Sequence, residues 1–145
     1  MANADSGSNA SGNVLDNDSD FFLEVWFYPR STGGGRHIIG RGGGNKSGWA
    51  PYDGHNWHLL MEKDCLYFQF ASDKGFGEIK STPVASNNWH YVTVRRTGNM
   101  TEMWWNGVFV GSSTAMPILP AIRDRIRIGG HTSKGSTGYF DGFIQ

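Results

Sequence analysis

The stretch from Asn88 to Gly107, NWHYVTVRRTGNMTEMWWNG, is the sequence feature that most constrains what this chain can fold into. Two runs of alternating side chains flank the tripeptide Thr97-Gly98-Asn99. Successive side chains of a strand point to opposite faces, and glycine and asparagine tolerate the backbone conformations of tight turns. We therefore expect a β-hairpin. Its uninterrupted apolar set should pair across the strands and point into a core: Val92, Val94, Met103 and Trp105.

Short strands separated by turn residues are expected along the rest of the chain. The run Phe21–Pro29, FFLEVWFYP, is almost continuously apolar, which predicts an interior strand covered on both faces. Val108–Gly111 is expected to continue the strand that ends at Trp105. The other expected strands are Arg36–Arg41, Trp57–Glu62, Cys65–Ala71, Phe76–Ser81, Arg125–Ile128 and Tyr139–Gln145. This pattern predicts an all-β fold, a two-layer antiparallel β-sandwich or jelly roll.

The length of 145 residues fits one domain. Residues 1–19 are rich in Ser, Asn, Asp and Gly, which predicts a flexible N-terminal extension before a folded domain at residues 20–145. Aromatic residues make up 14% of the chain and glycine occurs 21 times, and both values favour strands over helices.

The balanced charge, 13 basic against 13 acidic side chains, argues against nucleic acid as a partner. The local basic cluster of Arg123, Arg125 and Arg127 is interpreted as a solvated strand face, with a contact to phosphate or to an acidic glycan as the alternative. No run of about 18 apolar residues occurs, so we expect no membrane insertion. Cys65 is the single cysteine, which excludes an intrachain disulfide and is typical of a small buried apolar residue.

The acidic residues argue against catalysis. Glycoside hydrolysis needs paired carboxylates, whereas Glu24, Glu62, Glu78 and Glu102 are isolated in the sequence. Asp53, His55 and His58 resemble a zinc-ligand group, but the pattern is more typical of a polar loop. The lone histidines, His90 and His131, are expected to hydrogen-bond backbone carbonyls. We therefore expect no enzyme activity and no cofactor.

The sequence resembles a laminin-G-like jelly roll of the concanavalin-A-like superfamily from about Asp20 to Gln145. The segments that carry the resemblance are FFLEVWFYP, RHIIGRGG, WHLLMEKDCLYFQFAS, NNWHYVTVRRTGNMTEMWWNGVFVG, RIRIGG and YFDGFIQ. The combination of EVWFYP, WHYVTVRR and WWNGVFVG is similar to such domains in structural and tail-associated proteins of environmental phages. The resemblance implies a two-layer sandwich that binds other molecules.

Calcium is a further expectation that the resemblance raises. Family members carry an acidic residue where Gln145 stands here, and Ca²⁺ takes six to eight oxygen ligands with charge among them. This departure disfavours a bound calcium ion and leaves Asp20 and Asp141 as weak candidates.

Aromatic residues are the candidates for ligand contact, because flat rings stack against the apolar faces of sugars while polar neighbours orient the hydroxyls. The candidate binding residues are Trp49, Tyr52, Asp53, His55 and Trp104. The segment Trp49–Asn56 can equally form a packed cap over one end of the sandwich. Trp57 and one residue of the Trp104-Trp105 pair are expected in the core.

Three functions stay open at this point. The first is a non-catalytic virion surface component, a capsid decoration or fibre-attached domain synthesised in the host cytoplasm. Its expected partners are other virion proteins, further copies that join through open sheet edges, and host glycans. The second is a glycan- or protein-binding lectin-like module of an extracellular or cell-surface protein, part of a larger chain. The third, a glycoside hydrolase, is the least supported.

Overall fold

The computed structural model describes residues 20–42, 55–72, 75–114, 126–130 and 138–145. These residues form ten β-strands and no helix, so none of them lies in a helix that crosses a membrane. The strands are β1 (Phe21–Pro29), β2 (Arg36–Gly42), β3 (His55–Glu62), β4 (Cys65–Ser72), β5 (Gly75–Pro83), β6 (His90–Thr97), β7 (Met100–Trp105), β8 (Val108–Ser113), β9 (Ile126–Ile128) and β10 (Gly142–Ile144).

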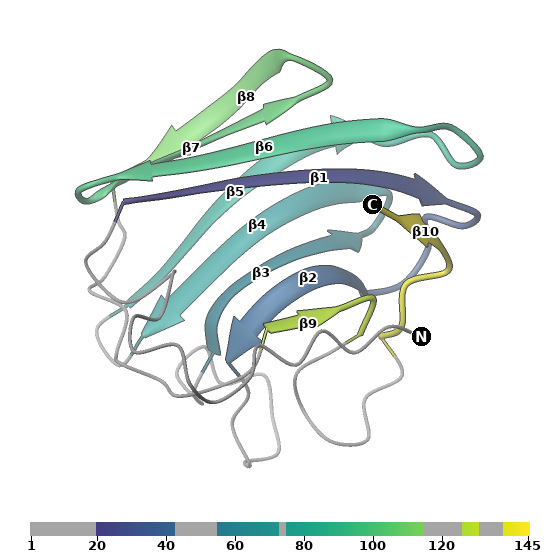
Figure 1. The fold of residues 1–145 in the computed structure, drawn as a ribbon, viewed down its shortest axis with the longest axis horizontal. Helices are drawn as coiled ribbons and strands as arrows, with labels where there is room; N and C mark the ends of the chain where they lie inside the picture. Colours follow the sequence, from purple (N-terminus) through teal and green to yellow (C-terminus); the bar gives the residue numbers. More distant parts are fainter. Residues whose placement is uncertain (1–19, 43–54, 73–74, 115–125, 131–137) are drawn as a thin grey trace.

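The strands form two five-stranded sheets. The first sheet has the order β10-β1-β6-β7-β8, and the second has the order β5-β4-β3-β2-β9. Every pairing between neighbouring strands is antiparallel. Figure 1 shows the two sheets as layers that face each other. The all-β antiparallel sandwich predicted from the sequence is therefore confirmed.

Tight turns join the strands of three hairpins. Lys63 and Asp64 have φ values of 48° and 64°, and Asn106 and Gly107 have values of 50° and 80°, the positive pair that a type I′ turn requires. Gly98 has a φ of 59° at the turn between β6 and β7. The predicted hairpins around Lys63-Asp64 and Gly98 are thus confirmed.

The expectation for Val108–Gly111 is wrong. The chain reverses at Asn106-Gly107, and Val108 opens β8, which runs antiparallel to β7. Asparagine followed by glycine is the strongest two-residue signal for a hairpin. The turn pair therefore starts a new strand at the edge of the first sheet.

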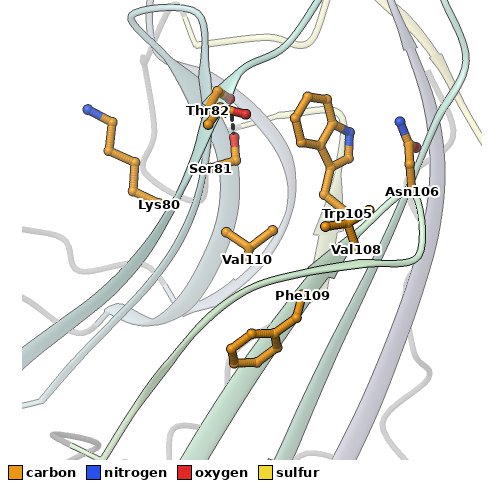
Figure 2. Close-up of a pocket in the computed structure, with 8 residues that line it drawn as sticks. All are labelled: Lys80, Ser81, Thr82, Trp105, Asn106, Val108, Phe109 and Val110. Carbon is orange, nitrogen blue, oxygen red and sulfur yellow. Dashed lines mark hydrogen bonds between the residues drawn. The ribbon is translucent and has the colours of Figure 1, made fainter.

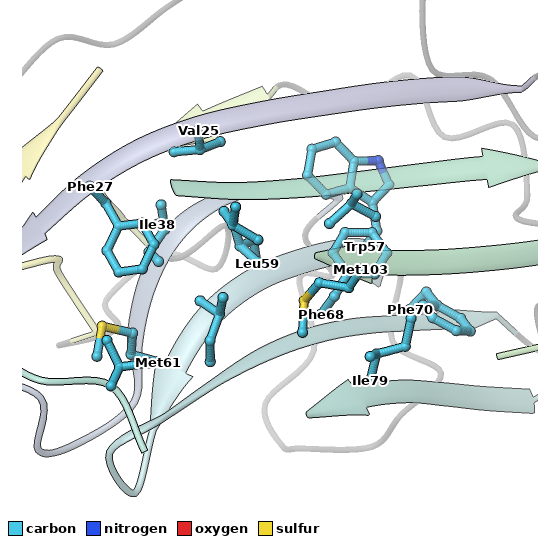
Figure 3. Packing of buried hydrophobic residues seen from close by; sticks show 14 of the residues in the cluster. Val25, Phe27, Ile38, Trp57, Leu59, Met61, Phe68, Phe70, Ile79 and Met103 are labelled. Carbon is cyan, nitrogen blue, oxygen red and sulfur yellow. The ribbon is translucent and has the colours of Figure 1, made fainter. Parts of the chain in front are cut away.

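The main core lies between the two sheets, as Figure 3 shows. Trp57 is fully buried, and its ring stacks on Phe21 from the opposite sheet with the ring centroids 6.2 Å apart. Val92, Val94 and Met103 are also fully buried, while Trp105 packs against the core with part of its ring exposed. The predicted inward set of the hairpin is confirmed. The buried cluster consists of Phe21, Val25, Phe27, Ile38, Trp57, Leu59, Met61, Leu66, Phe68, Phe70, Ile79, Val84, Val92, Val94 and Met103.

A hydrogen-bonded chain holds Trp105 in place. The Ala85 carbonyl oxygen lies 2.7 Å from Nε2 of His90, and since a carbonyl only accepts, this ring nitrogen carries the proton. The Nδ1 atom of His90 then accepts a hydrogen bond from the indole N–H of Trp105 at 3.3 Å. The expectation that His90 bonds a backbone carbonyl is confirmed. The histidine is a structural residue that positions the edge of the core.

The expectation that β1 is covered on both faces is wrong. Phe21, Val25 and Phe27 are buried, whereas Phe22 and Trp26 are 59% and 49% exposed. β1 is interior only in the sense that β10 and β6 flank it within the sheet. Its alternate side chains reach the outer face of the first sheet, and this face is the candidate functional surface.

Candidate functional site

The outer face of the first sheet, turned away from the second sheet, carries large exposed aromatic side chains. Trp89 is 49% exposed, Phe143 52% and Phe109 53%, in addition to Phe22 and Trp26 of β1. No strand among the described residues lies over this face (Figure 1). Single exposed apolar residues need no explanation, but a group of aromatic rings on one face marks an interaction surface.

The rings contact one another across the strands. Trp26 of β1 faces Tyr91 of β6 with the ring centroids 4.8 Å apart. Tyr28 lies 5.6 Å from Trp89 and 5.9 Å from Phe143 of β10, again between centroids. Such contacts between neighbouring strands stabilise the sheet and hold the rings in fixed positions.

A further pair continues the surface towards the other edge of the sheet. Trp104 of β7 is paired with Phe109 of β8, and their ring centroids are 5.6 Å apart in an edge-to-face arrangement. Thr93 of β6 is paired with Glu24 on β1 and with Trp104 on β7, so these three residues form one row across the sheet. Trp26 lies two residues beyond Glu24 on β1, in the next row on the same face. The rings therefore form a diagonal that touches all five strands.

We call this diagonal the aromatic band. Neighbouring strands lie about 4.8 Å apart, so the four strand spacings from β10 to β8 give the band a reach of roughly 20 Å across the sheet. Its members are Phe143, Tyr28, Trp26, Tyr91, Trp104 and Phe109, with Trp89 beside Tyr28.

Polar groups lie beside the rings. The hydroxyl of Tyr91 hydrogen-bonds to the carboxylate of Glu24, and this bond raises the pKa of the Tyr91 phenol above its ordinary value. The guanidinium of Arg95 lies 5.4 Å from the centre of the Trp104 ring, and its Nη2 and Nε atoms donate to one carboxylate oxygen of Glu102 at 2.6 and 3.1 Å. Hydrogen-bonding groups thus border the rings on this face.

A cleft of about 470 Å³ opens beside the band, between the edge strands β5 and β8 (Figure 2). Trp105 and Val110 line it with apolar surface. Of its polar side chains, Ser81 already has partners, because it donates to the Thr82 carbonyl at 2.6 Å and accepts from the Leu66 amide at 2.9 Å.

The outer face of the second sheet differs from the band. Leu60, Cys65 and Tyr67 form a small buried cluster there, which confirms Cys65 as a buried apolar residue. The ammonium of Lys80 lies 5.3 Å from the centre of the Tyr67 ring, and hydrogen bonding to Tyr67 raises the pKa of Lys80. Neither tryptophan nor phenylalanine contributes to this cluster.

The structure places only part of the predicted site. Trp49, Tyr52 and Asp53 lie outside the described residues, so their role stays a prediction. His55 is the first residue of β3. Trp104 lies in the aromatic band, beside Arg95. His58 of the suggested zinc group lies instead beside His37, with their Nδ1 atoms 3.1 Å apart.

The aspartates suggested for calcium lie at opposite ends of β1. The carboxylate of Asp20, just before β1, accepts a hydrogen bond from the amide of Gly98 at 2.7 Å. The carboxylate of Asp141 accepts from Ser31, just after β1, at 2.9 Å. Ten residue steps along a strand span roughly 30 Å, so the two side chains cannot hold one ion together. Among the described residues, no group of three or more metal-ligating side chains is found.

Sequence reasoning missed most of the band. Trp26, Tyr28, Tyr91, Phe109 and Phe143 were not among the predicted site residues, although Trp26, Tyr28 and Glu24 share one face of β1. The alternation of Glu24 with buried neighbours was the available signal, because a charged side chain marks the outer face of a strand.

Comparison with known proteins agrees with this fold. The family model described as the concanavalin A-like lectin/glucanases superfamily matches residues 3–145. None of the curated proteins compared with the chain matches it.

Solved structures give the same result. The sialidase carbohydrate-binding module CBM40 of Ruminococcus gnavus, bound to α2,3-sialyllactose, has a TM-score of 0.68 at 14% identity, with 88% of this chain and 71% of that one covered. Domains LG4-5 of the mouse laminin α1 chain have a TM-score of 0.66 at 15% identity, with coverages of 90% and 36%.

Domain 4 of an extracellular arabinanase from Geobacillus stearothermophilus, in complex with arabinotriose, has a TM-score of 0.64 at 12% identity, with coverages of 90% and 59%. These neighbours include carbohydrate-binding domains, and some of them are parts of enzymes. At such identities the likeness is one of fold. Together with the family model, it shows that the chain belongs to the concanavalin A-like lectin/glucanase superfamily.

Proposed function

We propose that this chain is a non-catalytic module that binds glycans through the aromatic band on the outer face of the first sheet. The observation that carries the proposal is the set of exposed rings, held by ring–ring contacts and bordered by Glu24, Arg95 and Glu102. Sugar rings bury their C–H faces on aromatic rings, and charged or amide groups orient the hydroxyls.

Two observations support this assignment. Two of the neighbours named above were solved with sialyllactose and with arabinotriose, so the same fold holds saccharides in other proteins. In addition, no strand of the described part of the chain covers the outer face of the first sheet, whereas Leu60 and Tyr67 on the outer face of the second sheet are buried.

The carboxylates of the band support a role without catalysis. Glu24 and Glu102 stand on β1 and β7, with β6 between these two strands. Each carboxylate also has its own hydrogen-bond partner, Tyr91 for Glu24 and Arg95 for Glu102.

A glycan array tests the proposal. The labelled protein should bind a subset of saccharides, and the double variant Trp26→Ala/Trp104→Ala should lose that signal while its far-ultraviolet circular dichroism stays unchanged. Tyr139→Ala is the matched control, because Tyr139 is 51% exposed and bridges to β2 of the second sheet. No signal on the array, or an equal signal from the double variant, would overturn the proposal.

The biological setting is a separate part of the proposal. We infer from the resemblance to phage structural and tail-associated proteins that the module is a virion surface component, synthesised in the host cytoplasm. A module of an extracellular or cell-surface protein is the alternative. Mass spectrometry of purified particles tests this part: the protein should co-purify with intact virions in a fixed ratio to the capsid protein, and its absence from them would favour the alternative.

A further inference from the structure

The charged side chains that border the aromatic band balance in sign, and two of them, Arg95 and Glu102, form an ion pair. Arg95 uses two nitrogen atoms on one oxygen of Glu102, and its plane also lies over Trp104. Arg30 lies 5.0 Å from the centre of the Phe143 ring at one end. Among the described residues that border the band, Arg30 and Arg95 carry guanidinium groups, and Glu24 and Glu102 carry carboxylates.

This balance disfavours an acidic ligand. A carboxylate or sulfate on a sugar is held by an arginine whose donors are free to form a fork, and Arg95 already directs two of its donors to one oxygen of Glu102. An incoming anion at the centre of the band would also approach the carboxylate of Glu24. Hydroxyl groups meet no such penalty, because they both donate to Glu24 or Glu102 and accept from Arg95.

The length of the band disfavours a single sugar. Trp26 and Trp104 are two strand spacings and one row apart, about 12 Å between backbone positions, which exceeds the width of one sugar ring. A monosaccharide therefore covers one ring pair and leaves the other exposed. An oligosaccharide that lies along the diagonal contacts both.

The tilt of the rings excludes a flat ligand. The ring planes of Trp26 and Tyr91 differ by 33°, and those of Trp104 and Phe109 differ by 60°. A planar crystalline polysaccharide surface cannot lie against rings in these different orientations. A single chain with freedom to rotate about its glycosidic bonds can.

From these observations we propose that the ligand is an uncharged, extended oligosaccharide chain that stacks on the Trp26–Tyr91 pair and the Trp104–Phe109 pair at once. This inference rests on the proposed function. It differs from what the fold alone would suggest, since the CBM40 neighbour was solved with an acidic saccharide.

Isothermal titration of the full chain tests the inference. The probes are neutral xylo-, manno-, gluco- and arabino-oligosaccharides, from the monosaccharide to the hexasaccharide, with sialyllactose and oligogalacturonate as acidic probes. Affinity for at least one neutral series should rise with chain length and should stay constant between low and high salt, because no net charge is neutralised on binding.

The variants separate the two ring pairs. Trp26→Ala and Trp104→Ala should each weaken binding of the hexasaccharide by about tenfold, the equivalent of one lost stacking contact. The affinity for a monosaccharide should fall in one variant and stay unchanged in the other, since one sugar occupies one pair. Tyr139→Ala should bind as the unaltered protein does.

The outcomes distinguish the two proposals. If no saccharide binds, neutral or acidic, the proposed function itself is overturned. If sialyllactose or oligogalacturonate binds best, with an affinity that falls with salt and is lost in Arg30→Ala, the module binds glycans but the inference about an uncharged ligand is wrong. Equal affinity for monosaccharide and hexasaccharide would refute the extended chain. Binding that both tryptophan variants retain in full would refute the site.

Discussion

The hydroxyl of Tyr91 on β6 donates a hydrogen bond to the carboxylate of Glu24 on β1, diagonally across two neighbouring strands of the aromatic band. Ionisation of the phenol would break this bond and place a second negative charge beside the carboxylate. The pKa of Tyr91 is therefore raised, with the bond to Glu24 as the largest cause. The polar groups of the band are coupled to its rings.

We predict that the Tyr91 phenol ionises at a higher pH than the same group in the unfolded chain, where the pKa is about 10. The folded state favours the neutral phenol, so this group stabilises the fold at low pH. Its contribution to the free energy of unfolding is complete below the unfolded pKa and is lost as the pH rises through the folded pKa. The measurement is the alkaline titration of phenolate absorbance, with Tyr91→Phe subtracted to isolate this residue.

Glu24→Gln should move that titration back towards the ordinary value. Glu62→Gln, a carboxylate variant on β3 of the other sheet, serves as the control. A Tyr91 curve that is the same in the Glu24→Gln variant as in the unaltered protein would contradict the hydrogen bond.

The two neighbouring tryptophans of β7 should differ in their contribution to stability. Trp105 packs against the core and donates to His90, so Trp105→Ala should lower the free energy of unfolding by about 3 kcal/mol, the lower end for a buried ring because this one is partly exposed. Trp104 lies on the outer face, and Trp104→Ala should cost about 1 kcal/mol or less. Urea unfolding measures both, and the reverse order would mean that the faces of β7 are exchanged.

Much of this fold is predictable from the sequence because alternation and turn chemistry are local. The hairpin around Gly98 follows from Thr97-Gly98-Asn99 and from the inward set Val92, Val94 and Met103, each of which is buried. The hairpin at Lys63-Asp64 is equally local. These signals need no knowledge of the other strands.

The aromatic face of β1 was harder to predict for a physical reason. Phe22 and Trp26 point outwards, and Phe21 and Phe27 point inwards. Both faces of the strand therefore carry apolar side chains, and the sequence shows no alternation between polar and apolar residues. Such a pattern suggests a strand that is buried on both faces. Only Glu24 breaks the pattern. An aromatic recognition surface thus has the same sequence pattern as a buried strand.

The band itself depends on sheet order, which is not a local property. Phe143 joins Tyr28 only because β10 pairs with β1, more than one hundred residues away in sequence. Phe109 joins Trp104 only because the chain reverses at Asn106-Gly107. Of the predicted site residues, Trp104 is the one that the described part of the chain places in this surface.

The indole of Trp57 offers another test of the core. Its nitrogen is buried and has no hydrogen-bond partner among the described residues. A buried donor without a partner costs about 1–3 kcal/mol, so Trp57→Phe removes that penalty along with part of the ring. We expect Trp57→Phe to unfold within about 1 kcal/mol of the unaltered protein, whereas Trp57→Ala should cost about 3–5 kcal/mol. Equal losses in the two variants would show that the nitrogen is satisfied in solution.

Gly77 of β5 lies directly against the ring of Phe70 on β4, which is its partner in the sheet. A Cβ atom at this position would overlap the ring, and Phe70 is almost completely buried and packs on Phe68 at 5.8 Å between centroids. Since close-packed interiors leave no room for the ring to move, Gly77→Ala should lower the free energy of unfolding by about 1–3 kcal/mol.

Gly33 is the matched control, because no atom lies within 4 Å of a Cβ built there, and Gly33→Ala should change stability by less than about 0.5 kcal/mol. The second variant Gly77→Ala/Phe70→Leu tests the cause. If the overlap with the ring is responsible, Phe70→Leu should lower the free energy of unfolding less in the Gly77→Ala variant than in the unaltered protein. The reason is that the added Cβ atom and the Phe70 ring compete for the same space. Additive losses in urea unfolding would mean that the overlap with the ring of Phe70 is not the cause of the loss.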